Sequence, residues 1–346
     1  MKISLIVTVK NEAASLPRLL DSIAAQTRAP DEIVIVDGGS TDATPDILRD
    51  YAARLPLQVI VQPGANISQG RNTAIRAAHG DIICSTDAGV RLEPTWLEEI
   101  AQPFDGRPTT DDRRPPTADS RTLAAVGGQR SAVVDVVSGF FVPDPRGVFE
   151  TALAATTLPV LADIRPEKFL PSSRSVAFRK TAWEQVGGYP VWLDYCEDLV
   201  FDFALRAAGC RVVFAPRAIA HFRPRSNLRG FFKQYYQYAR GDGKANLWLL
   251  RHLIRYTTYL VALPLVIALL VFGIWGLGFG ILVFGFLAMF FTPYERLLPM
   301  LRGMSFFDAL RAIAWVPVIR VAGDIAKMIG YPVGVVWRVK RARAGF

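Results

Sequence analysis

The sequence predicts an α/β fold, in which a mostly parallel sheet is flanked by helices and is followed by a C-terminal transmembrane helical hairpin. The first half of the chain alternates short β-rich apolar runs with stretches of helical periodicity, which is typical of βαβ units. Farther along, residues 256–294 contain no Asp, Glu, Lys or Arg. This run of 39 residues is about twice the ~20 residues needed to cross a bilayer.

The individual elements follow from hydrophobic periodicity. Apolar β-rich runs predict four strands, and apolar residues at helical spacing predict three helices between them; the strands are residues 3–9, 31–37, 57–62 and 81–87, and the helices are residues 13–27, 45–55 and 68–80. Ligands of parallel sheets bind beyond the carboxyl ends of the strands. Asn11, Asp37 and Asp87 all fall at such ends, so we expect a polar site there.

The region after the fourth predicted strand carries a shorter set of signals. Residues 103–121 are rich in Pro, Thr and charge, and they predict a mobile loop outside the core. Residues 123–141 return to strand, residues 174–190 predict a strand, a short helix and a Gly turn, and residues 196–216 predict a helix followed by a strand. We therefore expect one α/β domain over residues 1–225.

The C-terminal third is expected to meet a membrane. A helix of 39 residues would be ~58 Å long, so the four glycines of residues 273–280 predict a turn between two spans. Basic juxtamembrane helices are expected over residues 226–255, the hairpin over 256–294, and an interfacial helix with a basic tail over 295–346. Arg320, Asp324 and Lys327 recur at helical spacing, which favours an amphipathic helix lying on the membrane over a third span.

Charge and cysteine usage indicate partners and compartment. The formal net charge is +9, and residues 217–255 hold nine Lys or Arg against one acid. Because this patch directly precedes the apolar run, anionic membrane lipids are a better expected partner than nucleic acid. The N-terminal run is interrupted too soon for a signal peptide, and basic residues flank both ends of the hairpin. We expect a multi-pass protein of the cytoplasmic (inner) membrane, with the domain of residues 1–225 and the C-terminus in the cytosol.

Cys84, Cys196 and Cys210 show no metal-ligand spacing, and they fit a reduced cytosolic domain. Cys196 lies beside an acidic pair, where a packed thiol is the expected role.

Three polar loops follow predicted strands: "TVKNE", "DGGSTD" and "TDAG". No G-x-G-x-x-G follows the first strand and no P-loop occurs, which argues against dinucleotide binding and P-loop chemistry. Taken singly, each loop has a structural alternative. Asn11 could cap the following helix, and Gly38, Gly39 and Ser40 could simply turn the chain.

Taken together, "VTVKNE", "IVDGGSTDAT", "GRNTAI" and a strand that ends in an acid resemble glycosyltransferase family 2, of the membrane-anchored bacterial type. The resemblance extends over about residues 3–222 and implies the A-type nucleotide-sugar-binding fold. It implies that the first two loops hold the nucleotide of a sugar donor, with UDP the commonest carrier, through Thr8, Asn11, Glu12, Asp37, Gly38 and Ser40. Arg71 would approach the diphosphate, with a surface ion pair as its structural alternative.

The resemblance also implies a metal ion. The family ends the fourth strand with an Asp-x-Asp pair that binds Mg²⁺ or Mn²⁺ between the donor phosphates. Here the element reads Asp87-Ala88-Gly89, so the second acid is missing. A hard cation needs only one or two carboxylates plus phosphate and water, so Asp87 could serve as the single protein ligand.

A second constellation, "YCEDLVFDFALRAAG", resembles the Glu-Asp pair of the family's acceptor half. The resemblance implies that Asp198 takes the proton from the acceptor hydroxyl and that Glu197 is its partner. A general base near the nucleophile suits a single in-line displacement with inversion. The structural alternative is that both acids merely complement the helix dipole.

Weaker assignments surround this pair. Arg174 in "PSSRSVAFRK" and Arg240 in "QYARG" are candidate contacts to the acceptor or the diphosphate, the latter by resemblance to a Gln-x-x-Arg motif. Asp202 and Arg206 are four apart, which predicts a surface ion pair. His221 lies at a strand end and is expected to be structural.

The expected function is that of an inverting glycosyltransferase. It would move a sugar from a nucleotide-diphosphate sugar to a hydroxyl of a lipid-linked or membrane-proximal acceptor in cell-envelope glycan synthesis. Two spans are too few for a self-contained polymer channel. Two alternatives stay open: a polyprenyl-phosphate glycosyltransferase, whose phosphate acceptor needs no base, and a membrane-anchored nucleotide-sugar binder without catalysis, suggested by Gly89.

Overall fold

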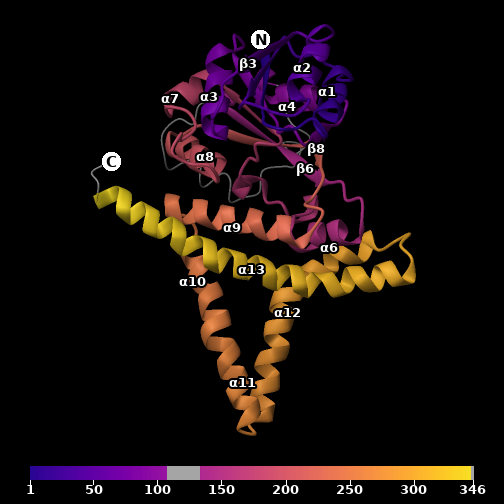
Figure 1. Ribbon diagram of the computed structural model, residues 1–346, viewed down its shortest axis with the longest axis vertical. Coiled ribbons are helices and arrows are strands. Elements are labelled where there is room, and N and C mark those ends of the chain that lie inside the picture. Colours follow the sequence, from indigo (N-terminus) through magenta and orange to yellow (C-terminus); the bar gives the residue numbers. More distant parts are fainter. Residues whose placement is uncertain (107–132, 344–346) are drawn as a thin grey trace. The chain divides into compact units, whose positions relative to one another are not determined.

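A computed structural model describes residues 1–106 and 133–343, which form two compact units (Figure 1). The first unit comprises Met1–Val142 and Leu161–Phe222, and the second comprises Pro143–Val160 and Arg223–Phe346. Pro143–Val160 therefore packs with the C-terminal helices, whereas the sequence analysis placed it inside a single domain of residues 1–225. This excursion carries no composition shift that a linear reading could detect.

The first unit confirms the predicted alternation. Its N-terminal half contains β1 (Ile3–Val9), α1 (Leu16–Ala24), β2 (Glu32–Asp37), α2 (Thr44–Ala52), β3 (Leu57–Val61), α3 (Ile67–Ala77) and β4 (Ile82–Ser85). These four strands pair in the order β3-β2-β1-β4, and all three pairs are parallel.

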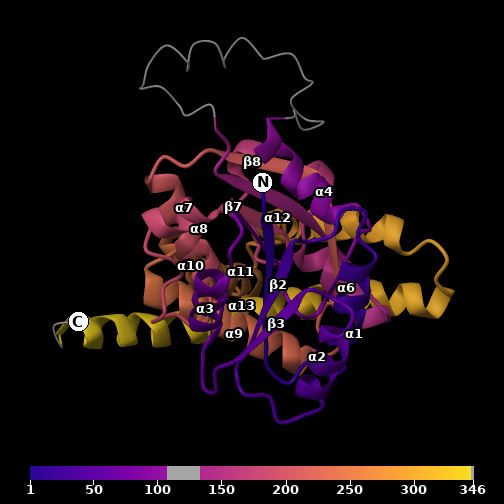
Figure 2. The same ribbon diagram turned by 90° about the horizontal axis from the view of Figure 1, so that it is seen from above.

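Alternate side chains of a strand point to opposite faces of the sheet. Leu5 and Val7 of β1 therefore share one apolar cluster with α1 and α2, and Ile6 shares the other with α3. Figure 2 shows α3 on one side of these strands and α1 and α2 on the other.

The rest of the sheet is mixed rather than parallel. It contains β5 (Val90–Leu92), β6 (Val136–Pro143), β7 (Val176–Arg179) and β8 (Val212–Phe222), and the full order is β3-β2-β1-β4-β7-β6-β8-β5. β7 runs antiparallel to β4 and to β6, and β5 runs antiparallel to β8. Parallel neighbours need a crossover across a sheet face, and the link from β6 to β7 instead leaves for the second unit. β5 was not predicted, because three residues are too few to show alternation.

The remaining helices of the first unit are short. They are α4 (Trp96–Ala101), α7 (Lys180–Gln185), α8 (Glu197–Ala207) and 3₁₀ turns at Gln102–Asp105, Leu161–Asp163 and Pro166–Lys168. The predicted mobile loop was wrong at its start, because Pro103 and Phe104 are buried in the turn that extends α4. Phe104 joins the apolar cluster beneath α1. Residues 107–121 of that prediction lie outside the described residues.

The second unit is helical. It contains α6 (Val148–Thr157), α9 (Leu228–Ala245), α10 (Leu249–Thr257), a π-helical turn (Thr258–Ala262), α11 (Leu263–Val271), α12 (Trp275–Met300) and α13 (Phe306–Arg343). α9 and α13 lie side by side (Figures 1 and 2). Their backbones approach so closely that a β-carbon on Gly330 or Gly334 would collide with the carbonyl oxygen of Tyr236 or Arg240. Glycine is needed there to let the two helices meet.

The predicted helical hairpin is confirmed. Leu249–Val271 and Trp275–Met300 are each long and apolar enough to cross a membrane, by length and composition. The chain reverses between them at Gly273, whose φ of 80° is left-handed and favours glycine. α11 packs against α12, and Gly278 faces Leu270 at their contact. Insertion of this hairpin in a bilayer stays a prediction.

Candidate functional site

The site is organised by the buried guanidinium of Arg71, at the middle of α3. Its Nη2 donates to Asp87 Oδ1 at 3.0 Å, just beyond the end of β4. Its Nη1 donates to Glu197 Oε1 at 2.6 Å, at the first residue of α8. The Arg71 side chain is only 3% exposed, so the structural alternative of a surface ion pair was wrong. One cation therefore joins the predicted donor side of the sheet to the predicted catalytic pair.

Asn72, the residue after Arg71 on α3, forms side-chain hydrogen bonds that support the same site. Its Nδ2 donates to the Tyr189 carbonyl, while its Oδ1 accepts from the Tyr189 amide and the Trp183 indole. The Tyr189 ring in turn lies beneath the Arg71 guanidinium, 5.4 Å from the ring centre. Sequence reasoning missed Asn72 and Tyr189 as supports of the site, although "GRN" and "GGY" carry them.

Burial and charge set the acidity of the predicted catalytic pair, Glu197 and Asp198. Burial raises the pKa of Glu197, and the Arg71 guanidinium opposes that rise. Burial also raises the pKa of Asp198, against the effects of Arg71 and of the Leu199 amide, which donates to Asp198 Oδ1 at 2.9 Å. A carboxylate with a raised pKa is a stronger base. Both acids face charged groups of the site, so a role limited to the helix dipole does not account for them.

Asp202 lies one helical turn after Asp198 and is 5% exposed. Its predicted surface ion pair with Arg206 was wrong. The Arg206 Nη2 atom donates instead to the Phe169 carbonyl at 2.7 Å. Asp202 Oδ2 is buried and has no hydrogen-bond partner. Burial raises the pKa of Asp202 well above its ordinary value, and Asp198 adds to the rise. The apolar positions on both sides of Asp202 are the signal that could have indicated its burial.

Arg174 approaches Asp87 from a second direction. Its Nε lies 4.0 Å from Asp87 Oδ2, and its guanidinium stacks 4.4 Å above the Phe222 ring. The Arg174 carbonyl accepts from Thr86 Oγ1 at 2.9 Å, which ties this loop to the end of β4. Two arginines therefore face one carboxylate that is about one-third exposed.

The first two loops bind each other. The Asn11 amide donates to Ser40 Oγ at 2.8 Å, and Asn11 Oδ1 accepts from the Thr41 amide at 2.8 Å. Asn11 adopts a left-handed φ of 56° and does not cap α1, whose N-cap residue is Ser15. The structural alternative of a helix cap was therefore wrong for Asn11.

Asp37 is buried, and its Oδ1 accepts from the amides of Gly39 and Ser40 and from Ser40 Oγ. Gly39 has φ of 87°, and a β-carbon there would lie 3.1 Å from Pro63 Cα, so glycine is favoured at this position, whereas Gly38 has ordinary backbone geometry. The hydrogen bonds of Gly39 and Ser40 are those of a chain turn, as the structural alternative for this loop expected. Nucleotide contact by Asp37, Gly38 and Ser40 stays a prediction.

The other predicted residues divide between the two units. Glu12 accepts from Ser15 Oγ through its carboxylate, and its amide donates to Thr44 Oγ1. Thr8 of β1 packs against Gly70, where a β-carbon would lie 2.8 Å from the Thr8 methyl group. Arg240 lies on α9 in the second unit.

Two residues read as structural are confirmed in that role. His221 pairs with Glu93. Cys196 is buried at the start of α8.

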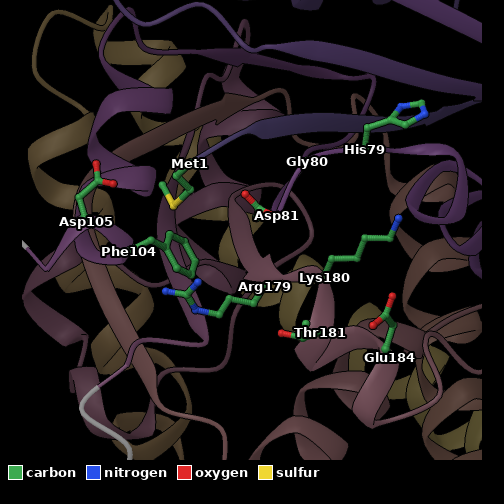
Figure 3. Close-up of a pocket in the computed structure, with 10 residues that line it drawn as sticks. All are labelled: Met1, His79, Gly80, Asp81, Phe104, Asp105, Arg179, Lys180, Thr181 and Glu184. Carbon is green, nitrogen blue, oxygen red and sulfur yellow. The ribbon is translucent and has the colours of Figure 1, made fainter.

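A hollow of about 510 Å³ lies elsewhere on the first unit, around Met1, Asp81, Arg179 and Lys180 (Figure 3). Met1 precedes β1 and Asp81 precedes β4, so the hollow lies at the amino ends of the parallel strands. Figure 3 shows acidic side chains around the hollow, including Asp105 and Glu184, together with the basic side chains of Arg179 and Lys180. The Arg71 cluster lies at the opposite, carboxyl end, where ligands of such sheets bind.

The side chains of the site could hold a metal ion through a single protein ligand. Among the described residues, no three His, Cys, Asp or Glu side chains gather as a metal site. A β-carbon on Gly89 would meet no heavy atom within 4 Å, so the place of the missing second acid is open. Asp87 offers Oδ2, which faces only the more distant Arg174. This set fits Mg²⁺ or Mn²⁺ if phosphate and water supply the other ligands.

The fold and these contacts define a class of protein. A mixed α/β sheet presents cationic and acidic side chains together at the carboxyl ends of its parallel strands. Such an arrangement is chemically suited to a negatively charged ligand and to proton transfer.

Comparison of the sequence with models of known protein families supports the same class of protein. Residues 4–125 match the model described as Glycosyl transferase family 2, and residues 144–307 match Glycosyl transferase family group 2. The chain belongs to glycosyltransferase family 2.

Similar proteins include validoxylamine A glucosyltransferase of Streptomyces hygroscopicus subsp. limoneus, 33% identical over 102 residues. That match covers 28% of this chain and 22% of the relative. The glycosyltransferase AglE of Haloferax volcanii is 23% identical over 275 residues, which cover 78% of this chain and 81% of AglE. Among solved structures, the mannosyltransferase PcManGT of Pyrobaculum calidifontis, in complex with GDP-Man and Mn²⁺, is 18% identical with a TM-score of 0.48. That likeness covers 94% of this chain and 87% of PcManGT.

Proposed function

We propose that this protein is an inverting glycosyltransferase that moves a sugar from a nucleotide-diphosphate donor to a hydroxyl group of an acceptor at the membrane. The observation that carries the proposal is the double contact of Arg71 with Asp87 and Glu197. It brings the ends of β4 and α8 within the span of one arginine side chain. A donor phosphate and an acceptor hydroxyl must lie this close for a single displacement.

The donor would lie along the carboxyl ends of β1, β2 and β4. Because β1 separates the other two strands, Asp37 and Asp87 end strands about 10 Å apart. That spacing suits a nucleotide whose ribose lies near the Asn11–Ser40 contact and whose diphosphate lies near Asp87. We expect a UDP sugar, with Thr8 and Glu12 beside the nucleotide.

Arg71 and Arg174 would meet the charge of the diphosphate. Arg174 lies 4.0 Å from Asp87 Oδ2 and rests on the Phe222 ring, so a phosphate oxygen bound beside Asp87 would lie close to its guanidinium. Asp87 would hold Mg²⁺ or Mn²⁺ through Oδ2, and the bound metal would neutralise charge on the departing diphosphate.

Asp198 would act as general base. Glu197 is bound to Arg71 at 2.6 Å and is therefore engaged, which leaves Asp198 for the proton. The acceptor oxygen attacks the anomeric carbon, the bond from that carbon to the diphosphate oxygen breaks, and the hydroxyl proton moves to Asp198. The nucleoside diphosphate leaves as an anion, and the configuration at the anomeric carbon inverts.

The proposed acceptor class follows from a proposed membrane location. The two apolar helices are long and apolar enough to cross a membrane. Because basic residues flank both ends of this segment, we place the protein in the cytoplasmic membrane as a multi-pass protein, with the catalytic unit and C-terminus in the cytosol. A lipid-linked or membrane-proximal glycan acceptor, as in cell-envelope synthesis, would be presented there. Arg240 on α9 and the basic residues near it would contact anionic lipid or acceptor phosphate. The same cationic surface is not expected to bind nucleic acid.

The test uses the full-length protein in lipid nanodiscs with a panel of nucleotide sugars and lipid acceptors. Asp198→Asn should lower turnover about 10²–10⁴-fold while the donor Kd stays unchanged. Asp46→Asn is the matched control, because Asp46 is exposed on α2 and pairs only with Arg49. Nearly normal turnover of Asp198→Asn would point instead to a phosphate acceptor that needs no base. Absence of diphosphate release with every donor would support a non-catalytic binder.

A further inference from the structure

Between residues 312 and 339, the exposed side of helix α13 is entirely apolar. Every residue of 312–339 that is exposed is apolar; these are Ile313, Ala314, Val318, Val321, Ile325, Ile329, Pro332, Val333, Val336 and Val339. They recur every three or four residues, so they form one continuous stripe along the helix. A large contiguous apolar surface on a helix marks an interaction site.

Two charged residues of the same helix, Asp324 and Lys327, contact other helical segments of the second unit. Asp324 is buried and accepts from Arg255 Nε of α10 at 2.6 Å and from the Tyr259 hydroxyl at 3.1 Å. The Lys327 Nζ lies 4.7 Å from the centre of the Tyr235 ring of α9. The sequence analysis predicted an amphipathic helix from the helical spacing of Arg320, Asp324 and Lys327. In the structure the Arg320 side chain is 40% exposed, and its Nε lies 3.5 Å from Asp324 Oδ2. Asp324 and Lys327 have partners on other helical segments, which a linear pattern does not reveal.

We propose that the exposed stripe of α13 is immersed in the acyl-chain surface of a bilayer leaflet, with the helix lying in the plane of the membrane. This inference rests on the proposed membrane insertion of the α11–α12 hairpin. The stripe continues the apolar exposure of that hairpin within the same unit, including Leu250 and Ile254 on α10.

Two features favour the membrane plane over a third span. Residues 312–339 would measure ~42 Å as a helix, which exceeds a ~30 Å hydrocarbon core. Along one side, α13 packs against α9, whose Arg229, Lys233 and Lys244 could not enter that core. A helix with a polar neighbour on one side and an apolar stripe on the other lies at the interface.

Charge at the ends of the stripe fits lipid headgroups. Arg311 precedes it, and Lys340 and Arg343 follow it; all three are exposed. Basic side chains at such ends reach the phosphate level while their apolar neighbours remain in the acyl region. A second copy of this chain would leave this charge pattern unexplained.

The test places spin labels on the full-length protein in nanodiscs that contain phosphatidylglycerol. Cys210→Ala supplies the background, because Cys84 and Cys196 are buried. Cysteines replace Ile325, Ile329 and Val336 one at a time. Matched controls are Asp46→Cys on the exposed surface of α2 and Leu265→Cys on α11.

Collision with a water-soluble nickel complex should be lost at the three α13 sites and at Leu265, and retained at Asp46, while oxygen reaches the α13 labels. Nickel collisions at the α13 sites alone would overturn the inference. Exclusion of both reagents with spin–spin broadening would also overturn it, in favour of a second copy. If the nickel complex also collides with the label at Leu265, the proposed insertion of the hairpin in the membrane is contradicted as well.

A second measurement needs no variant and guards against misfolding. Lipids that carry a photoactivated carbene in the acyl chain should label α11, α12 and the stripe of α13 in the wild-type protein. Peptides of α2 and α8 should stay unlabelled. Labelling confined to α11 and α12 would overturn the inference and leave the hairpin in place.

Discussion

Removing the Arg71 guanidinium tests whether the site is held by a buried ion pair. Arg71→Met keeps an unbranched chain in place and deletes the donors to Glu197 at 2.6 Å and Asp87 at 3.0 Å. Glu197 is nearly buried, so its carboxylate would be left without a counterion. Breaking a buried pair from one side costs about 3–5 kcal/mol. Asp87 adds less, because water reaches its side chain.

The magnitude converts to a measurable shift. The first unit has about 200 residues, for which 1 kcal/mol corresponds to roughly 2–4 °C of Tm. Arg71→Met should therefore lower the Tm by about 6–20 °C. Arg71→Met/Glu197→Gln should recover more than half of that loss, because no buried charge remains. The assay is thermal unfolding of the full-length protein in nanodiscs, followed by tryptophan fluorescence, which includes the buried Trp96 of the first unit.

Arg49→Met is the matched control. Arg49 and Asp46 form an ion pair at the same 3.0 Å, but both side chains are about 70% exposed. Exposed pairs contribute ~0–1 kcal/mol, so this variant should melt close to wild type. Two results would refute this reasoning: a Tm of Arg71→Met equal to that of Arg49→Met, or a further fall in Tm when Glu197→Gln is added to Arg71→Met. Either would mean that the buried ion pair does not stabilise the site.

Three further changes probe other parts of the chain. Gly334→Ala should destabilise the second unit by about 1–3 kcal/mol, because its β-carbon would strike the α9 backbone, whereas Gly285→Ala on α12 meets open space and should be neutral; equal melting of the two variants would contradict this. Asp202→Asn removes a carboxyl whose pKa is raised in the folded chain, chiefly by burial. Above pH ~4 the unfolded chain releases a proton that the folded chain retains, so wild-type stability falls as pH rises and the variant should gain by up to about 1.4 kcal/mol per pH unit; parallel Tm curves between acidic and mildly basic pH would disprove it. Gly89→Asp should fold normally, since its place is open, and should tighten Mn²⁺ binding roughly tenfold in calorimetry, whereas unchanged affinity would remove Asp87 from a metal role.

Much of the fold could be predicted from the sequence. The apolar runs of β1 to β4 and the helical stripes of α1 to α3 are local patterns, and they are confirmed with small shifts of boundary. The glycines around Gly273 likewise predicted the reversal between two apolar helices. These signals are strong because each depends on the spacing of near neighbours in one segment. The sequence analysis did not predict β5, and its prediction of a mobile loop was wrong at Pro103. In both places only three or four residues form the element, which is too few to show a periodic pattern.

The candidate site was predicted in part. The acids and Arg71 were found because they belong to loops and helix starts with recognisable residue order. Their pairing was not found, since Arg71 and Glu197 are 126 positions apart and Arg71 and Asp87 are 16 apart. The same limit explains Asp202 and Arg206, whose spacing suggested a surface pair although Asp202 is buried.

The sequence by itself determined the strand–helix alternation, the polar strand ends and the two long apolar helices, because periodicity and composition act between neighbours in the chain. Only the tertiary structure decided which charges are buried and which face is exposed. Arg71 is inside because three separate elements close around it, and Asp324 is inside because α10 supplies Arg255. Burial is a property of the space between segments, and the free energy of an ion pair depends on that burial more than on the residues' own identities.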